Sequence, residues 1–177
     1  HAWIVTYLIW SNESTPPSSP DHVYNAHPEY LMEDNAGNKY LAEGYYIDPG
    51  HPGGQEWNYN VVMDLVSNYD IDGIHFDYIR YPQRNSGYNP TAIQRYNDEY
   101  GLSGQPDYTD AQFSDWRRRQ ITEWLRNTYV DVVAVKPNME VTAATFSDRS
   151  DAYIYRFQDW AKWMDNNILD ANMPMNY

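Results

Sequence analysis

The sequence predicts an α/β chain that forms part of a (β/α)8 TIM barrel, with parallel strands alternating with helices. Apolar segments typical of buried strands alternate along the chain with segments of helical period, and such alternation favours right-handed βαβ units. A whole barrel takes about 250 residues, whereas this chain has 177 and four predicted strands, which amounts to half a barrel. A doubly wound open sheet is the alternative, although no Gly-x-Gly-x-x-Gly motif follows any strand.

The first predicted strand is the apolar run Ala2–Trp10, which is rich in β-branched and aromatic residues and typical of a buried strand. Residues 11–53 follow without a clear period and contain several prolines. A loop of this length is usually functional or poorly ordered, and its short apolar groups favour an ordered excursion with short helices or ribbons. We therefore expect a single incomplete domain over residues 1–177, with a long loop at 11–53.

The remaining elements follow from apolar spacing and helix-start signals. Trp57, Val61, Leu65 and Tyr69 recur every four residues, which is typical of an amphipathic helix. Asn89 before Pro90 is typical of a helix start. The expected elements are a helix at 52–69, a strand at 70–79, helices at 89–100 and 110–133, a strand at 139–146, a helix at 152–166 and a strand at 168–177. The basic run Arg117–Arg119 lies within the fourth of these and predicts a solvated helix face.

Composition excludes several classes of protein. The net charge is −13, and nucleic-acid binding needs a concentrated basic surface, so nucleic acid is not an expected partner. No apolar run approaches the roughly 20 residues that span a bilayer. The chain has no cysteine, which excludes disulfides and thiolate metal sites. Its 18 tyrosines and 7 tryptophans suit surfaces that are part apolar and part wet, as sugar-binding clefts are.

The second predicted strand carries the most informative side chains. Because side chains alternate along a strand, His75 and Asp77 share one face, and Ile74 and Phe76 share the other. In a barrel the apolar face meets the helices, and Asp77 then lies near the mouth where barrel active sites are found. An isolated buried carboxylate is costly, so Asp77 is either functional or paired, with Arg80 as the nearest candidate partner.

The sequence resembles the glycosyl hydrolase-like 10 family at two motifs, Tyr46–Pro52 (YIDPGHP) and Asn68–Pro82 (NYDIDGIHFDYIRYP). His1–Trp3 is similar to the family's third strand, and 158–160 with 169–177 is similar to the stretch into its sixth. The resemblance implies an exported TIM-barrel glycosidase-like protein, periplasmic, cell-surface or secreted, that acts on an oligo- or polysaccharide. Some members act on bacterial cell-wall glycans. We expect an internal piece of a longer protein, with the remainder of the barrel as its partner.

Glycoside hydrolysis normally needs two carboxyl groups. Asp77 is the candidate nucleophile or base. Asp148 follows the third strand and is the candidate for the second carboxyl group, although it would equally cap the next helix. Asp48 is a further candidate, unless it serves as a turn residue before Pro49-Gly50. The residues expected to bind or orient the substrate are His75, Arg80, Tyr7, Trp10, Tyr46, Asp48, His51, Asn176 and Tyr177.

Three alternatives accompany this hypothesis. Family 18 chitinases have the similar motif Asp-Gly-x-Asp-x-Asp-x-Glu, but His75 and Ile79 replace its second Asp and its catalytic Glu, so we reject that family. A non-catalytic glycan-binding barrel would lack a second acidic group within about 10 Å of Asp77. A metal-dependent hydrolase would use Asp48 and His51 together with His75 and Asp77. We expect neither a metal nor another cofactor.

Overall fold

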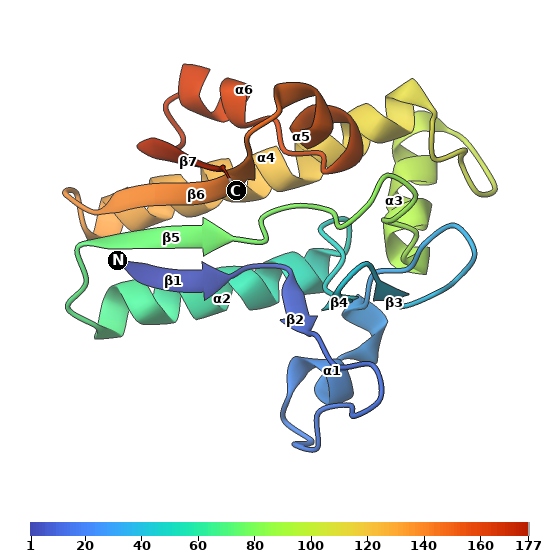
Figure 1. Cartoon of the computed structure of the whole chain (residues 1–177), viewed down its shortest axis with the longest axis horizontal. Helices are drawn as coiled ribbons and strands as arrows, with labels where there is room; N and C mark the ends of the chain where they lie inside the picture. The colour runs from blue at the N-terminus through green and yellow to red at the C-terminus, as the bar shows by residue number, and fades with distance from the viewer. Residues whose placement is uncertain (177) are drawn as a thin grey trace.

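The computed structural model describes residues 1–176, which contain a four-stranded and a three-stranded sheet (Figure 1). All pairings in the larger sheet are parallel, and its strand order is β1-β5-β6-β7. Its strands are β1 (Ala2–Val5), β5 (Gly73–Asp77), β6 (Glu140–Phe146) and β7 (Ala171–Met175). Successive strands are therefore neighbours in the sheet, as they are in a barrel.

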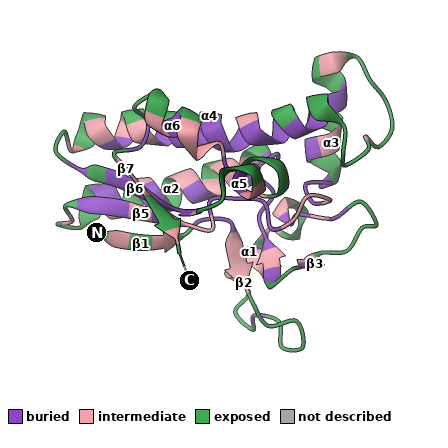
Figure 2. Ribbon diagram, turned by 45° about the horizontal axis from the view of Figure 1, so that its top comes forward, coloured by how far each residue is buried: buried purple, intermediate pink, exposed green. Residues whose placement is uncertain are grey.

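The helices between these strands cover one face of the sheet. Helices α2 (Pro52–Asn68), α4 (Ala111–Val135) and α6 (Trp160–Asp165) contribute to the same hydrophobic core as the buried face of β5. The Phe76 ring, for example, lies 5.4 Å from the Trp124 ring of α4. On the opposite face Trp3 is 71% exposed, and Val5 and Met173 are exposed as well. In contrast to β5, strands β1 and β7 contain no buried residue (Figure 2). A doubly wound sheet carries helices on both faces, so the structure is that of a partial barrel.

The predicted first strand is wrong in its length and its burial. It divides into β1 and β2 (Leu8–Trp10), and β2 belongs to the smaller sheet. The N–H group of Thr6 still donates to the carbonyl of Asp77, but the carbonyl of Tyr7 accepts from the N–H of Ile47. The chain therefore leaves the parallel sheet here, because residues from the long loop offer β2 an antiparallel partner.

The long loop at 11–53 is an ordered excursion, in agreement with its short apolar groups. Its strand β4 pairs with β2 and its strand β3 pairs with β4, in the order β2-β4-β3. Gly44 is needed in β4, because a Cβ atom there would lie 2.3 Å from the carbonyl oxygen of Trp10. The elements of the excursion are α1 (Val23–Ala26), the 3-10 helix η1 (Pro28–Tyr30), β3 (Tyr40–Leu41) and β4 (Gly44–Tyr46).

The long helices begin close to where the sequence predicts. Helix α3 (Pro90–Tyr100) has Asn89 as its N-cap, whose side chain accepts from the Thr91 N–H group. Helix α4 begins after the N-cap Asp110, which accepts from the Phe113 N–H group. Within the described part of the chain, no helix combines the length and apolar character needed to cross a membrane.

The basic run on α4 is not a solvated face, and that prediction is wrong. Arg117 is fully buried and Arg118 is only 9% exposed. The Arg117 guanidinium lies 4.2 Å from the centre of the Phe113 ring and 4.0 Å from that of Phe157. Its nitrogens donate to the carbonyl oxygens of three loop residues, Arg84, Ser86 and Tyr108.

The helix predicted at 152–166 is two short helices, α5 (Arg149–Tyr155) and α6. The break contains Phe157, whose φ of 55° is in the left-handed region and whose side chain is fully buried. Its ring packs edge-on against Tyr81 at 5.1 Å. Burial of this large ring among residues far away in the sequence offsets the cost of interrupting the helix.

Candidate active site at the carboxyl end of β5

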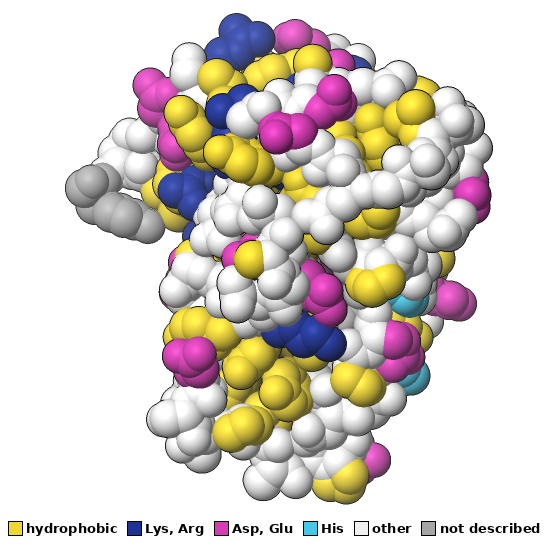
Figure 3. Space-filling model, turned by 90° about the vertical axis from the view of Figure 1, so that its right-hand side faces the viewer, with side chains coloured by type: hydrophobic (Ala, Val, Ile, Leu, Met, Phe, Trp, Pro, Cys, Tyr) yellow, Lys and Arg dark blue, Asp and Glu magenta, His cyan; other side chains and the backbone are white. Residues whose placement is uncertain are grey.

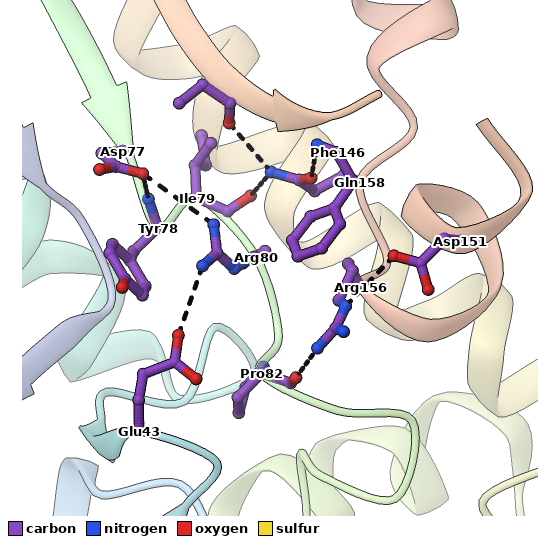
Figure 4. A network of polar contacts seen from close by, with 11 residues as sticks. Glu43, Asp77, Tyr78, Ile79, Arg80, Pro82, Phe146, Asp151, Arg156 and Gln158 are labelled. Atoms are coloured by element: carbon purple, nitrogen blue, oxygen red, sulfur yellow. Dashed lines mark hydrogen bonds and ion pairs between the residues drawn. The ribbon is translucent and has the colours of Figure 1, made fainter. Parts of the chain in front are cut away.

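Asp77 is the last residue of β5 and lies at the end of the sheet toward the excursion (Figures 1 and 4). Its Oδ1 atom accepts from the Tyr78 N–H group at 2.7 Å and lies 3.9 Å from Nη1 of Arg80. Tyr78 has a φ of 51°, so the chain turns sharply directly after the strand. The carboxylate is therefore held by one backbone donor and one cation at the mouth of the partial barrel.

Arg80 is a buried cation between two carboxylates. Its guanidinium lies 4.1 Å from the centre of the Tyr78 ring and 5.0 Å from that of Phe146. While Nη1 faces Asp77, Nη2 lies 3.4 Å from Oε1 of Glu43 (Figure 4). The pairing of Arg80 with Asp77, which the sequence analysis considered, is present, and the structure adds Glu43 as a second acidic partner.

Glu43 is a site residue that sequence reasoning missed. It lies at the tip of the β3–β4 hairpin, directly after Ala42, whose φ is 51°. Burial and the negative charge of Glu43 together raise the pKa values of the Tyr46 and Tyr78 phenols. The Ala-Glu-Gly sequence between short apolar groups is compatible with a turn, but only the pairing of β4 with β2 carries that turn to Arg80.

The two carboxylates are close enough to act on one bond. Both contact the same guanidinium, so their nearest oxygens are no more than about 10 Å apart. Glycosidases that retain configuration have carboxyl groups about 5 Å apart, and inverting enzymes have them roughly 6.5–9.5 Å apart. Glu43 is therefore an acidic group within about 10 Å of Asp77, the distance that separates the hydrolase hypothesis from the glycan-binding alternative.

His75 lies on the same strand face as Asp77, and its ring is held by a side chain of the neighbouring strand β6. Its Nδ1 atom is 2.9 Å from Oγ1 of Thr142, and that hydroxyl donates to the carbonyl of Ile74 at 3.3 Å. Burial lowers the pKa of His75, an effect that the charge of Asp77 partly opposes. The ring is thus neutral at pH 7.

Asp148 is not part of this network. Its side chain is exposed and caps α5, where Oδ1 accepts from the Asp151 N–H group at 2.7 Å. Of the two roles predicted for Asp148, the structure shows the helix cap. The acidic side chain that shares Arg80 with Asp77 is Glu43.

Asp48 is fully buried and joins two loops. It accepts from the N–H groups of Gly50 at 2.7 Å and of Asn89 at 3.2 Å. Burial raises the pKa of Asp48 to about 6, although the two hydrogen bonds and the charges of Arg117 and Arg95 oppose this effect. Asp48 therefore acts within the turn before Pro49-Gly50, as the structural alternative predicted.

His51 is the N-cap of α2, and its Nδ1 accepts from the Gly54 N–H group at 3.3 Å. Its ring also contacts that of Tyr30 at 4.8 Å, so it does not face solvent. Among residues 1–176, no three His, Asp or Glu side chains lie close enough together to hold a metal ion. Asp48, His51, His75 and Asp77 therefore do not form the ligand set that the metal-dependent alternative required.

The aromatic residues predicted to bind substrate differ in burial and in the contacts of their side chains. Tyr7 and Tyr46 are fully buried, so neither offers an open ring for stacking. Trp10 donates through Nε1 to the carbonyl oxygens of Asn12 and Thr15, and it contacts the loop rather than Arg80 or Asp77. Asn176 is exposed, and Tyr177 lies outside the described residues.

A different aromatic cluster lies on the hairpin that carries Glu43. The Tyr45 ring is 4.8 Å from that of Tyr24 and 5.3 Å from that of Tyr40, and all three side chains are partly exposed. Figure 3 shows the end of the molecule that includes this hairpin, where hydrophobic side chains gather beside basic and acidic ones. Tyrosines that expose rings next to charged groups are suited to the apolar faces and hydroxyl groups of sugars.

Comparison with known proteins shows which protein family the sequence of this chain matches. The family model described as glycosyl hydrolase-like 10 matches residues 2–177. The whole chain is 25% identical over 200 residues to glycosyl hydrolase DigH of Escherichia coli (strain K12), of which it covers 42%. It is 26% identical over 193 residues to glycosyl hydrolase YngK of Bacillus subtilis (strain 168), of which it covers 35%. The chain thus spans less than half the length of these curated relatives.

Solved structures agree in fold. The glycoside hydrolase domain of PgaB (BpsB) from Bordetella bronchiseptica superposes with a TM-score of 0.71 at 18% identity, over 99% of this chain and 50% of that domain chain. Alpha-L-fucosidase isoenzyme 2 from Paenibacillus thiaminolyticus gives a TM-score of 0.57 at 21% identity, over 73% of this chain and 20% of the other. These likenesses concern the fold, and they confirm the prediction of a partial glycosidase-type barrel.

Proposed function

Because this chain belongs to the glycosyl hydrolase-like 10 family, we propose that the protein containing it hydrolyses O-glycosyl bonds of an oligo- or polysaccharide by carboxylate catalysis. Its relatives DigH and YngK are named glycosyl hydrolases. The remainder of the barrel, in the full-length protein, would complete the cleft around Asp77. Bacterial cell-wall glycans are one substrate class within this proposal.

The observation that carries the proposal is the position and support of Asp77. The carboxylate stands at the carboxyl end of a parallel strand, the end at which barrel enzymes bind substrate. The Tyr78 N–H group and the Arg80 guanidinium hold it in place. A fixed carboxylate there can attack the anomeric carbon, or can deprotonate water while it stabilises the positive charge that develops on the sugar ring.

The glycan-binding alternative without catalysis assumed that no second acidic group lies near Asp77. Glu43 is such a group, since it contacts the same guanidinium. The partly exposed tyrosines on and beside the Glu43 hairpin, Tyr24, Tyr40 and Tyr45, support a glycan that runs from the carboxylates across the smaller sheet. Both features favour hydrolysis of a bound sugar over binding alone.

The test compares the full-length protein with its Asp77→Asn variant on peptidoglycan-derived and plant-type glycans, measured by release of reducing ends. We expect the wild type to cleave at least one glycan and the variant to be slower by about 100-fold or more. Asp165→Asn, which alters an exposed carboxylate at the end of α6, is the matched control and should retain activity. Unchanged hydrolysis by Asp77→Asn would overturn the role of Asp77, and binding without cleavage by the wild type would support the alternative.

A further inference from the structure

We propose that Glu43 is the second catalytic carboxyl group and donates a proton to the leaving glycosidic oxygen. This assignment rests on the proposed hydrolysis of O-glycosyl bonds. It differs from the expectation for Asp148, whose carboxylate caps α5. The proposal follows from the connection that Arg80 makes, from the different exposure of the two acids and from the buried donors that lie between them.

Arg80 connects the two acids through different nitrogens. Nη1 lies 3.9 Å from Asp77 and Nη2 lies 3.4 Å from Glu43. The rigid guanidinium thereby holds the carboxylates apart while it keeps them within about 10 Å, which includes the separations of both known classes of glycosidase. The two acids come from different elements, since Asp77 ends β5 and Glu43 lies in the β3–β4 hairpin, so they can face a bound sugar from two sides.

The two acids differ in the way that their roles require. The side chain of Asp77 is 13% exposed and is held by the Tyr78 N–H group and the Arg80 guanidinium, as a nucleophile or base of fixed position requires. The side chain of Glu43 is 47% exposed and lies 3.4 Å from Arg80, and it also acts on the phenols of Tyr46 and Tyr78. The exposed Glu43 carboxyl group can therefore be covered by a bound glycan and reach its leaving oxygen, as an acid catalyst must.

Buried donors near both acids lack partners within residues 1–176. Nη1 of Arg80 has no hydrogen-bond acceptor, although the side chain is only 7% exposed. The fully buried hydroxyl of Tyr46 also has no acceptor at full hydrogen-bond geometry, although Glu43 is close enough to raise its pKa. Buried donors usually find partners, and an unsatisfied pair deserves an explanation. Sugar hydroxyl groups bound between Asp77 and Glu43 would supply the missing acceptors.

The reaction balances with these two groups and one water molecule. The Glu43 carboxyl proton moves to the glycosidic oxygen as the bond from the anomeric carbon to that oxygen breaks. Asp77 either bonds to the anomeric carbon, to be displaced by water later, or deprotonates the water that attacks. In the first route the water proton returns to Glu43, and in the second it goes to Asp77 and then to solvent while Glu43 is reprotonated.

The test uses the full-length Glu43→Gln variant with two substrates of the same sugar, the glycan that the wild type cleaves and the corresponding 2,4-dinitrophenyl glycoside. Dinitrophenolate leaves without protonation, so only the glycan needs the acid. We expect kcat/KM to fall by about 100-fold or more for the glycan and by less than about 10-fold for the dinitrophenyl glycoside. The decline of the wild-type rate at high pH, which reports the acid, should disappear in the variant.

Three further variants separate catalysis from structure. Asp77→Asn should lose activity on both substrates, since it removes the other carboxylate. Glu33→Gln changes a carboxylate in the same excursion that pairs with Lys39 at 3.5 Å, and should leave both rates unchanged. Glu43→Asp keeps a carboxyl group and should recover part of the activity on the glycan. Thermal unfolding of each variant checks that it is folded.

If Glu43→Gln lowers kcat/KM by the same factor on both substrates and keeps the wild-type pH profile, the assignment is overturned and Glu43 is only a charge partner of Arg80. Unchanged activity on the glycan would overturn it as well. If the wild type cleaves glycans and Asp77→Asn does not, the proposed function stands independently of either result. A wild type that cleaves no glycoside would overturn the proposed function and, with it, the role of Glu43.

Discussion

The buried carboxylate of Asp48 accepts a hydrogen bond from the backbone N–H group of Asn89, 3.2 Å away and 41 positions along the chain. Asn89 is also the N-cap of α3, and its side-chain amide donates to the carbonyl oxygens of Glu29 and Leu31. These contacts join the excursion that carries Glu43 to the loop that follows Asp77. The position of the hairpin beside Arg80 therefore depends on these hydrogen bonds around the buried Asp48 and Asn89.

Stability should respond to pH through Asp48. Burial raises its pKa from 3.8 to about 6, so the folded protein binds a proton more tightly than the unfolded chain does. The free energy of unfolding that Asp48 contributes should therefore increase by about 1 kcal/mol as the pH falls from 7 to 5. Burial lowers the pKa values of His51 and His75, which acts in the opposite direction, so a difference between variants is needed.

The measurement is chemical denaturation of the wild type and of Asp48→Asn at pH 7, 6 and 5. Because the amide that Asp48→Asn introduces does not titrate, the stability of the wild type relative to this variant should increase toward pH 5. Asp165→Asn, at an exposed site, is the control for the loss of one carboxyl group. A constant difference for Asp48→Asn would show that this carboxyl group has an ordinary pKa in the folded protein.

Gln158 should be needed for folding at the mouth of the partial barrel. Its buried amide donates to the carbonyl oxygens of Ile79 and Ala144 and accepts from the N–H group of Phe146 (Figure 4). Gln158→Ala leaves these backbone groups buried without partners, so the free energy of unfolding should fall by about 2–4 kcal/mol in denaturant titrations. Gln94→Ala, on the exposed side of α3, should change it by less than about 0.5 kcal/mol.

Arg117 should tolerate replacement poorly although it lies in a run of three arginines. Its two terminal nitrogens donate to several carbonyl oxygens while aromatic rings cover its faces, and a lysine ammonium cannot reproduce that planar set of donors. Arg117→Lys should lower the free energy of unfolding by about 2–3 kcal/mol. Arg126→Lys, on the exposed side of the same helix, is the control. Equal stability of the two variants would contradict the structural role of Arg117.

Asp148 should matter for stability and not for catalysis. Asp148→Ala removes the N-cap of α5 and should lower the free energy of unfolding by about 1 kcal/mol, while Asp148→Ser, which keeps a capping oxygen, should have a smaller effect. Both variants should cleave the glycan within about twofold of the wild-type kcat/KM, because their carboxyl change lies outside the Asp77–Arg80–Glu43 network. A folded Asp148→Ser protein without activity would restore Asp148 as the catalytic candidate.

The sequence by itself determined the periodic parts of this protein. Alternation along β5 placed His75 and Asp77 on one face and Ile74 and Phe76 on the other, and apolar spacing located α2 and α4, because strand and helix periods depend only on local geometry. The order of strands and helices also predicted a parallel, barrel-like sheet. The Asp77–Arg80 pair was within reach of such reasoning, since the two residues lie three positions apart.

Only the tertiary structure decided which distant side chains meet. The division of Ala2–Trp10 into β1 and β2 depends on an antiparallel partner from β4, and the break between α5 and α6 depends on a core position for Phe157. The environment of Arg117 is made by loops that carry no periodic signal. Glu43 joins Arg80 across 37 positions, because strand β4 of its hairpin pairs with β2. Contacts of this kind follow from the packing of separate segments, which local patterns do not encode.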